Sequence, residues 1–344
     1  MKKGLLIITQ TVDNRDSNLG FFCDWINQFA KVGGPLYIIA NKVGTFSFPP
    51  NVQVFSLGKE NSKNRISRIF QFWLLLIKVI PKINGTFVHM CPEYVIYGAW
   101  INRFFGKKLA LWYTHKSISW KLLLAEKMVN KIFTASRESF RLASKKCEVL
   151  GHGINLEKFY APIQKENTIK LLSIGRISET KGQMLAIEVL EKLISLDNKV
   201  SLTIVGEPIT KDDNNYLEKL KNKIKQSRLE NYIYLLGGKK HEDLPSIYHK
   251  HNILIHTSIT GSLDKVVIEA LAAGIQVVTT SNAYVIVEDA IKMVSERETE
   301  TLAWAVEDII KTGIINPPKN LRERLEKNYG LTGCIDKITN YFNK

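Results

Sequence analysis

The feature that most restricts the fold of this chain is a regular alternation between short apolar runs and longer helical patterns, which occurs twice. The first series predicts strands at 4–9, 35–40, 86–90, 109–114, 131–136 and 147–153. Between them it predicts helices near 20–33, 65–80, 92–105 and 118–129. The second series predicts strands at 169–175, 200–206, 232–238, 252–258 and 276–281, again separated by helices. Continuous apolar strands that alternate with helices are typical of parallel sheets covered on both faces.

Two such series predict an α/β chain with two doubly wound parallel-sheet domains, and a chain of 344 residues that is 45% hydrophobic is long enough for two cores. We expect the domains at 1–158 and 159–320, because the stretch 159–168 is polar and contains a proline. The last helix, about 321–344, has no strand after it, and we expect it to pack back on the first domain.

The charge is distributed very unevenly along the chain. Residues 1–160 hold 23 Lys and Arg against 9 Asp and Glu, whereas residues 161–344 hold 25 against 24. A basic half of this kind indicates an anionic partner, such as a phospholipid surface, a lipid-linked phosphate or a nucleic acid. The aromatic residues lie mostly in apolar runs, and the sequence shows no recognisable nucleic-acid motif, so we expect no nucleic acid.

The most apolar segment, 65–83, has basic residues at both ends, and its uncharged core is too short to span a bilayer. Two interpretations remain open: a helix lying in a membrane interface, and a core helix with basic ends. Four widely separated cysteines indicate a reducing compartment. We therefore expect a cytoplasmic protein, with peripheral association on the inner face of the cell membrane as a further option.

Ligands of open parallel sheets bind beyond the carboxyl ends of the strands. The stretch SIGRISETKGQ (173–183) ends a predicted strand and begins a helix, and it supplies Gly175, Arg176 and Lys181. Glycine permits close approach of the backbone, and two cations five positions apart can converge on a diphosphate. The alternative is a surface turn with solvated charges.

The stretch TGSLDKVVIEALAAGIQVV (260–278) starts a second helix of interest. The unpaired N–H groups of a helix start favour a phosphate, whereas Lys265 in the first turn is unfavourable unless an anion is held there. Glu269 lies one turn further on the same face, where a carboxylate could reach ribose hydroxyls. The alternative is an ordinary Lys–Glu pair on a solvated face.

Other candidates are weaker. His115 follows a buried strand, a position more often structural than catalytic, and KDDNN (211–215) places two adjacent aspartates in a predicted polar loop. The sequence lacks GxxxxGK[ST], HExxH and GxSxG motifs and shows no Cys or His at metal-ligand spacing. We expect metal-free chemistry without a cofactor.

In chain order, the stretches THKSISW, GRISETKGQ and GSLDKVVIEALAAGIQVVTT resemble the retaining glycosyltransferases of family 4. This resemblance implies the GT-B fold, with two Rossmann-like domains facing each other across a cleft. It also implies that the N-terminal domain binds the acceptor and the C-terminal domain binds the nucleotide-activated sugar.

By position, Arg176 and Lys181 match the family's pair that neutralises the donor diphosphate, and Glu269 matches the glutamate that holds the ribose. His115 matches a histidine near the transferred sugar. The resemblance further implies that donor binding involves Gly20, Gly175, Gly261, Ser262, Leu263, Asp264 and Lys265.

Two residues depart from the family's pattern. Gly261 stands where the first of two glutamates eight positions apart is usual, so the carboxylate that contacts the donor sugar is missing, and Asp264 is a candidate to replace it. Asn155 stands where an aspartate is usual.

The resemblance implies a metal-independent hexosyltransferase that moves a sugar from a UDP- or GDP-linked donor to a hydroxyl of a glycan or polyprenyl-linked acceptor. Synthesis of a cell-surface polysaccharide or glycolipid is the expected setting. The missing glutamate motivates one alternative, a catalytically weakened partner subunit. The basic half motivates another, weaker one, a nucleic-acid-binding protein.

Overall fold

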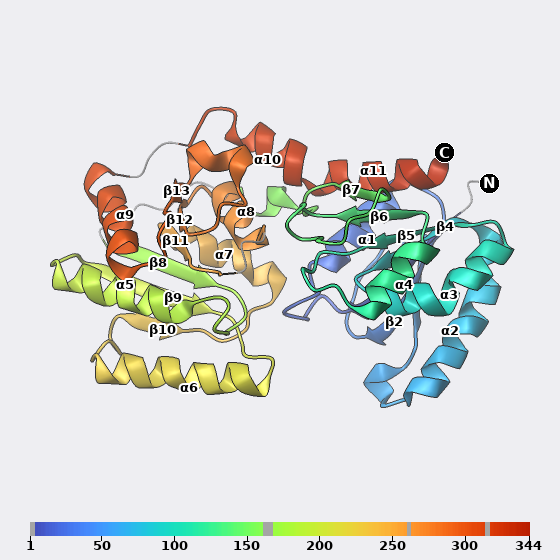
Figure 1. Ribbon diagram of the computed structural model, residues 1–344, viewed down its shortest axis with the longest axis horizontal. Helices are drawn as coiled ribbons and strands as arrows, with labels where there is room; N and C mark the ends of the chain where they lie inside the picture. The colour runs from blue at the N-terminus through green and yellow to red at the C-terminus, as the bar shows by residue number, and fades with distance from the viewer. Residues whose placement is uncertain (1–3, 161–167, 260–262, 314–316) are drawn as a thin grey trace. The chain divides into compact units, whose positions relative to one another are not determined.

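The computed structural model describes residues 4–160, 168–259, 263–313 and 317–344, which form two compact units (Figure 1). Unit 1 comprises Met1–Asn155 and Asn328–Lys344, and unit 2 comprises Leu156–Lys327. The chain passes from unit 1 to unit 2 three residues before the predicted boundary. It returns to unit 1 at Asn328, within the stretch 321–344 that is predicted to form a single helix.

Unit 1 is built on a seven-stranded sheet in the order β3-β2-β1-β4-β5-β6-β7, in which all neighbouring strands are parallel. The interior strand β1 carries Leu6, Ile7 and Ile8, which are buried on both faces of the sheet, and this explains its unbroken apolar sequence. The strands are β1 (Gly4–Val12), β2 (Leu36–Val43), β3 (Val52–Ser56), β4 (Ile83–His89), β5 (Lys108–Trp112), β6 (Lys131–Thr134) and β7 (Cys147–Val149).

Helices cover both faces of the unit 1 sheet. On one face, α1 (Phe22–Lys31) packs against α11 (Leu331–Asn343), and both contribute to one buried apolar cluster. On the other face lie α2 (Arg65–Val79), α3 (Pro92–Phe104) and α4 (Trp120–Met128), which share a second cluster. Figure 1 shows these three helices next to one another, and α3 packs against both of its neighbours.

Unit 2 is built on a six-stranded parallel sheet in the order β10-β9-β8-β11-β12-β13. This order makes β8 and β11 neighbours although they are far apart in the sequence. The strands are β8 (Ile169–Ile174), β9 (Val200–Val205), β10 (Ile233–Leu235), β11 (Ile253–His256), β12 (Gln276–Thr279) and β13 (Lys292–Met293).

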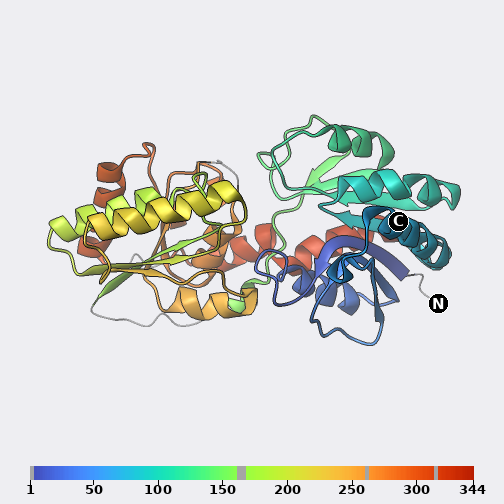
Figure 2. The ribbon, with the colours of Figure 1, turned by 90° about the horizontal axis from the view of Figure 1, so that it is seen from below.

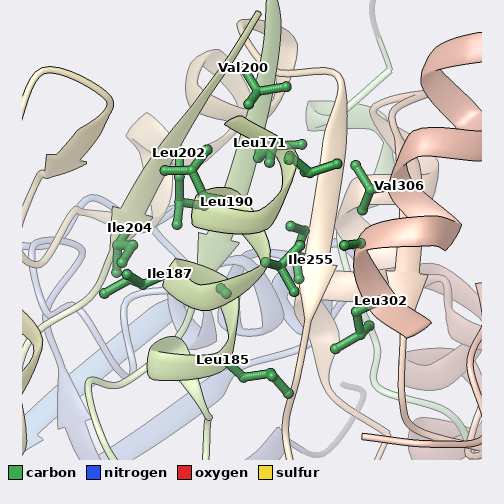
Figure 3. Close-up of a cluster of buried hydrophobic side chains, with 14 of the residues drawn as sticks. Leu171, Leu185, Ile187, Leu190, Val200, Leu202, Ile204, Ile255, Leu302 and Val306 are labelled. Atoms are coloured by element: carbon green, nitrogen blue, oxygen red, sulfur yellow. The ribbon is translucent and has the colours of Figure 1, made fainter. Parts of the chain in front are cut away.

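One face of the unit 2 sheet is covered by α5 (Gln183–Ser195), α6 (Lys211–Gln226) and α9 (Thr299–Thr312), and α7 (Leu244–His249) and α8 (Lys265–Ala272) lie on the other. Figure 2 shows α5 and α6, in yellow-green and yellow, on the side of the strands opposite to α7. Figure 3 shows the buried apolar cluster of unit 2, where side chains of α5, α9 and the strands meet, among them Leu171, Leu190, Leu202, Ile255 and Leu302. Short 3-10 turns occur at Lys59–Asn61, Ile80–Lys82, Leu156–Lys158, His241–Asp243 and Val285–Ala290.

Several elements differ from the sequence-based predictions. The strands β3 and β13 are not predicted, because β3 is a partly exposed edge strand and β13 has only two residues. The helix α9 is also absent from the sequence-based predictions. The stretch 211–215 is the first turn of α6 and not a loop, since Thr210 and Asp213 form a reciprocal capping box there. The predicted last helix is two helices, α10 (Leu321–Tyr329) and α11, separated by the extended backbone of Gly330.

Candidate functional site

The loop that follows β8 is joined by hydrogen bonds to the loop that follows β11. Thr257 donates its hydroxyl to the carbonyls of Lys181 and Gly182, at 3.0 and 2.9 Å, and the backbone N–H of Ile259 donates to the carbonyl of Thr180 at 3.0 Å. Because β8 and β11 are adjacent and parallel, both loops leave the same edge of the sheet. This edge, at the carboxyl ends of the strands, is where ligands of open parallel sheets bind.

Glycines allow the loops at this edge to approach closely. A Cβ atom on Gly206, the residue after β9, would lie 1.9 Å from the carbonyl oxygen of Gly175, the residue after β8. The aliphatic part of the Lys181 side chain passes over Gly175, with its Cδ atom 3.6 Å from the place a Cβ would occupy. A residue larger than glycine at position 206 would therefore displace backbone, whereas at position 175 the φ of +151° is what favours glycine.

Lys181, Asp264 and His256 form a connected polar group at this edge. The Lys181 Nζ lies 2.6 Å from Asp264 Oδ2, and His256 Nε2 lies 2.9 Å from the same oxygen. His256 is itself held by a 2.8 Å contact between its Nδ1 and the hydroxyl of Thr279. Burial opposes ionisation of Asp264, but the hydrogen bond from His256 and the charge of Lys181 outweigh it, so the pKa of this carboxyl lies well below its ordinary value.

Tyr284 fixes the start of α8 through two hydrogen bonds to the backbone of Asp264. The Tyr284 hydroxyl accepts the backbone N–H of Asp264 at 2.9 Å and donates to the Asp264 carbonyl at 3.2 Å. Asp264 is the residue before the helix, and its side chain makes no cap to the helix, since its carboxylate turns to Lys181 and His256. Leu263 is buried, and Lys265 is the first residue of α8. The predicted residues Gly261 and Ser262 lie outside the described residues.

Arg176 takes a different partner from Lys181. Its Nε lies 3.8 Å from Asp213 Oδ2, and its side chain is 42% exposed. Asp213 belongs to the capping box of α6; burial opposes its ionisation, but hydrogen bonds from the N–H groups of Thr210 and Ile209 outweigh this and lower its pKa. The structure therefore places Arg176 in the loop after β8 with Lys181, but its ion pair points to α6.

Glu269 is buried in α8 and not on a solvated face. Tyr248 of α7 donates its hydroxyl to Glu269 Oε2 at 2.9 Å, and both side chains are almost completely inaccessible. Burial raises the pKa of Glu269 above its ordinary value, while the bond from Tyr248 and the positive charge of Lys265 act in the opposite direction. The interpretation of Lys265 and Glu269 as a solvated surface pair is therefore wrong.

The two candidates in unit 1 lie in loops that follow strands. His115 comes three residues after β5, is exposed, and its Nδ1 lies 2.7 Å from the hydroxyl of Ser117. Gly20 precedes α1, and its N–H donates to the carbonyl of Asp16 at 2.9 Å. A Cβ on Gly20 would lie 2.6 Å from that same oxygen, so the turn requires glycine.

Sequence reasoning missed His256, Thr257 and Tyr284, which organise this site. His256 ends β11 and Thr257 follows it, so the rule that ligands bind at strand ends points to both of them. Tyr284 gives no such signal, because it lies in an irregular segment and its contact with Asp264 depends on how the chain returns after β12. Among the described residues, no group of three or more His, Cys, Asp and Glu side chains could hold a metal ion.

Comparison with known proteins identifies the family. The family model described as "Glycosyl transferases group 1" matches residues 157–329, half of the chain. The chain belongs to this family. The match covers unit 2 almost completely, so this group 1 glycosyl transferase carries its family signature in the unit that holds Lys181, Asp264 and Glu269.

Two curated relatives resemble part of this group 1 glycosyl transferase. An uncharacterized glycosyltransferase of Methanocaldococcus jannaschii is 34% identical over 126 residues, which are 36% of this chain and 29% of the relative. N-acetylgalactosamine-N,N'-diacetylbacillosaminyl-diphospho-undecaprenol 4-alpha-N-acetylgalactosaminyltransferase of Campylobacter jejuni is 30% identical over 149 residues, 42% of this chain and 38% of the relative. The chain thus spans less than two fifths of the length of either relative.

Two solved structures share the fold over the full length of the chain. Anabaena HepE, crystallised with UDP, has a TM-score of 0.75 at 15% identity and covers 100% of both chains. Sucrose-phosphate synthase from Thermosynechococcus elongatus has a TM-score of 0.77 at 15% identity and covers 99% of this chain and 98% of its own. With the two parallel sheets described above, these likenesses confirm the predicted GT-B fold.

Proposed function

We propose that this protein is a retaining glycosyltransferase of family 4 that binds a nucleoside-diphosphate sugar at the strand-end site of unit 2. The observation that carries the proposal is the convergence of Lys181, Asp264 and the start of α8 at the carboxyl ends of β8 and β11, within the segment that matches the family. A cation, a glycine-lined loop and a helix start together suit a diphosphate.

In this proposal the diphosphate lies between Lys181 and the first turn of α8. Asp264 holds the Lys181 ammonium at 2.6 Å, so the cation is positioned before any donor arrives. The phosphate oxygens then take hydrogen bonds from Lys181 and from the N–H groups at the start of α8, and Lys265 in this turn faces an anion. Arg176 is exposed enough to turn from Asp213 to the same diphosphate.

Glu269 is proposed to bind the ribose. The Tyr248 hydroxyl donates to its Oε2 and fixes the orientation of the carboxylate, and Oε1 is proposed to accept a hydrogen bond from a ribose hydroxyl. A buried carboxylate is costly unless donors satisfy it, and the hydroxyls of a bound ribose are such donors. The sugar itself is proposed to contact Asp264, which compensates for the glutamate missing at position 261.

The proposed reaction is transfer with retention of configuration. The bond between the anomeric carbon and the diphosphate oxygen breaks, the acceptor hydroxyl forms a new bond on the same face, and its proton passes to the departing diphosphate. Negative charge grows on the leaving oxygens, where Lys181, Arg176 and the α8 N–H groups stabilise it. His115 is proposed to orient the donor sugar, and these residues act without a metal ion.

The donor is proposed to be UDP- or GDP-linked, and the acceptor a glycan or a polyprenyl-linked sugar. The Campylobacter jejuni relative is named for a diphospho-undecaprenol acceptor, and Anabaena HepE was crystallised with UDP. The names of these two proteins and the basic N-terminal half of this chain support a lipid-diphosphate acceptor in cell-surface polysaccharide or glycolipid synthesis, on the cytoplasmic side of the membrane.

Isothermal titration with UDP, GDP and their sugar derivatives tests the donor site. Lys181→Met should weaken the binding of the preferred donor by about 10- to 100-fold, because one buried charge-assisted contact to phosphate is lost. Lys219→Met is the matched control, since Lys219 pairs with Glu179 on the exposed surface, and it should bind as the wild type does. Equal donor binding by both variants would refute the proposed site. Retention of configuration is tested separately, by NMR of the anomeric centre of the product.

A catalytically weakened partner subunit remains the second candidate. Its support is Gly261 in place of the usual glutamate, together with 26% identity over 117 residues to the GPI3 subunit of the Saccharomyces cerevisiae phosphatidylinositol N-acetylglucosaminyltransferase. Slow hydrolysis of the bound donor by the purified protein distinguishes the two, because a non-catalytic subunit releases no free sugar.

A further inference from the structure

The outer side of α2 is unusually apolar for a helix on the surface of a protein unit. Ile66, Phe70, Leu74 and Ile77 are 82%, 61%, 53% and 52% exposed. Their spacing of four, four and three residues puts them on one face of the helix. The opposite face, with Phe72, Leu76 and Val79, is buried against the sheet. The helix thus has a core face and a second, exposed apolar face, and the interpretation of segment 65–83 as a membrane-interface helix stays a prediction.

The two neighbouring helices extend this exposed apolar face. Trp100 and Phe104, one turn apart on α3, are 58% and 81% exposed, and Trp120 at the start of α4 is 68% exposed. Because α2, α3 and α4 cover the same face of the sheet and α3 packs against both others, their outer sides point the same way. We call this surface the α2–α4 face, made of Ile66, Phe70, Leu74, Ile77, Trp100, Phe104, Trp120, Leu123, Leu124 and Met128.

Close packing holds these helices side by side. A Cβ atom on Gly98 of α3 would lie 2.9 Å from a methyl group of Leu76 of α2, so glycine permits this approach. Trp73 of α2 donates its Nε1–H to the carbonyl of Tyr97 at 2.9 Å, and Arg65 donates to the Tyr97 hydroxyl at 2.8 Å. These contacts fix α2 against α3, and α3 in turn packs against α4, so the three helices form one continuous support for the α2–α4 face.

The charge around the α2–α4 face is almost entirely positive. From Asn61 to Met128 the sequence has eleven Lys and Arg residues and two acidic residues, Glu93 and Glu126. Lys63 and Arg65 lie at the start of α2, Lys78 and Lys82 at its end, and Arg103 on α3, all exposed. Aromatic and aliphatic side chains bordered by cations match the interface of an anionic bilayer, with its apolar interior and negative headgroups.

We propose that the α2–α4 face docks unit 1 on the surface of a membrane that contains anionic phospholipids. The apolar side chains enter the headgroup region and the flanking cations pair with lipid phosphates. The described helices contain none that is long and apolar enough to cross a membrane, so the contact is peripheral. This inference does not depend on the donor site in unit 2.

Flotation of the full chain with lipid vesicles tests the docking. The protein should float with vesicles of phosphatidylcholine and phosphatidylglycerol, less with phosphatidylcholine alone, and less again at high salt. The variant Phe70→Ser, Leu74→Ser, Trp100→Ser, Phe104→Ser should lose at least about ten-fold in partitioning to the anionic vesicles. Lys78→Gln with Lys82→Gln should lose binding to the anionic vesicles only.

The matched control replaces four exposed apolar residues of unit 2 by serine: Ile209, Val285, Met293 and Trp304. It should float as the wild type does. Circular dichroism and thermal unfolding show that each variant is folded, so that loss of flotation with an unchanged unfolding midpoint isolates the surface. A second readout is the fluorescence of Trp100 and Trp120, which should shift to the blue on docking and be quenched by brominated lipid.

Three results would overturn the proposal: wild-type protein that stays in the buffer with anionic vesicles, flotation unchanged in the four-residue variant, or equal loss in the control. A wild-type dimer that dissociates in the four-residue variant, without vesicle binding, would assign the α2–α4 face to a second copy of the chain. Sedimentation of both proteins without lipid distinguishes that outcome.

Discussion

The Tyr248 hydroxyl donates to Glu269 Oε2 at 2.9 Å, and the pair is buried between α7 and α8. A carboxylate with so little access to water depends on this donor and on the nearby charge of Lys265. The pair therefore couples stability to pH in a direction that can be measured.

Glu269→Gln should stabilise the protein at neutral pH and have little effect near pH 4. Burial raises the folded pKa of Glu269, so its contribution to stability is fully present below the ordinary carboxyl pKa of about 4.3 and is lost as the pH rises through the raised value. Glutamine does not ionise and avoids this loss. Urea unfolding of both proteins across this pH range measures the difference, and a larger effect at acidic than at neutral pH would contradict it.

Asp264→Asn should show the opposite pH dependence. The pKa of Asp264 lies below its ordinary value, so its stabilising contribution is present above about pH 4 and is lost as the pH falls through the lowered folded value. The variant should thus be less stable than the wild type at neutral pH and equal to it at strongly acidic pH. The same urea titrations test this, with the exposed Asp212→Asn as control.

Asp264→Asn should also bind free nucleoside diphosphate more tightly and turn over more slowly. Removing a carboxylate 2.6 Å from Lys181 relieves its repulsion of phosphate, which is worth about 1 kcal/mol or roughly a five-fold gain in affinity. Turnover falls because the donor sugar loses its proposed carboxylate contact. Calorimetry with UDP and GDP and a transfer assay measure the two effects, and weaker binding of free diphosphate by the variant would contradict this account.

Gly206→Ala should destabilise unit 2 by about 1–3 kcal/mol, because an added methyl group must push back the carbonyl of Gly175. Denaturant unfolding followed by tryptophan fluorescence and circular dichroism measures the cost. The control is Gly333→Ala in α11, where a Cβ meets no atom within 4 Å and alanine favours the helix. Donor affinity should fall with Gly206→Ala and stay constant with Gly333→Ala.

His115→Ala should reduce turnover strongly and leave nucleotide binding almost unchanged. The side chain is exposed and holds Ser117, so its removal disturbs little of the core. We expect a loss of about 100-fold in kcat, the size usual for one catalytic side chain. Ser117→Ala separates the histidine from its local hydrogen bond, and full activity of His115→Ala would exclude the proposed role.

The sequence allowed much of the sheet architecture to be predicted, because buried parallel strands read as unbroken apolar runs. A strand whose side chains are only partly buried lacks such a run, and for this reason β3 was not predicted. The site was harder, since its geometry depends on partners from other elements. Lys181 and Asp264 proved to be neighbours, but Arg176 pairs with Asp213, a residue that the sequence pattern placed in a loop. No local pattern reports that Tyr248 reaches Glu269 or that Tyr284 reaches Asp264.

Lys181 and Asp264 are 83 positions apart in the chain, and they meet because β11 joins the sheet beside β8. The contact between the ammonium and its carboxylate therefore requires that β8 and β11 have paired. A nucleotide that binds there consequently recognises the completed central pair of strands, and nucleotide affinity serves as a gauge of whether these two strands have paired.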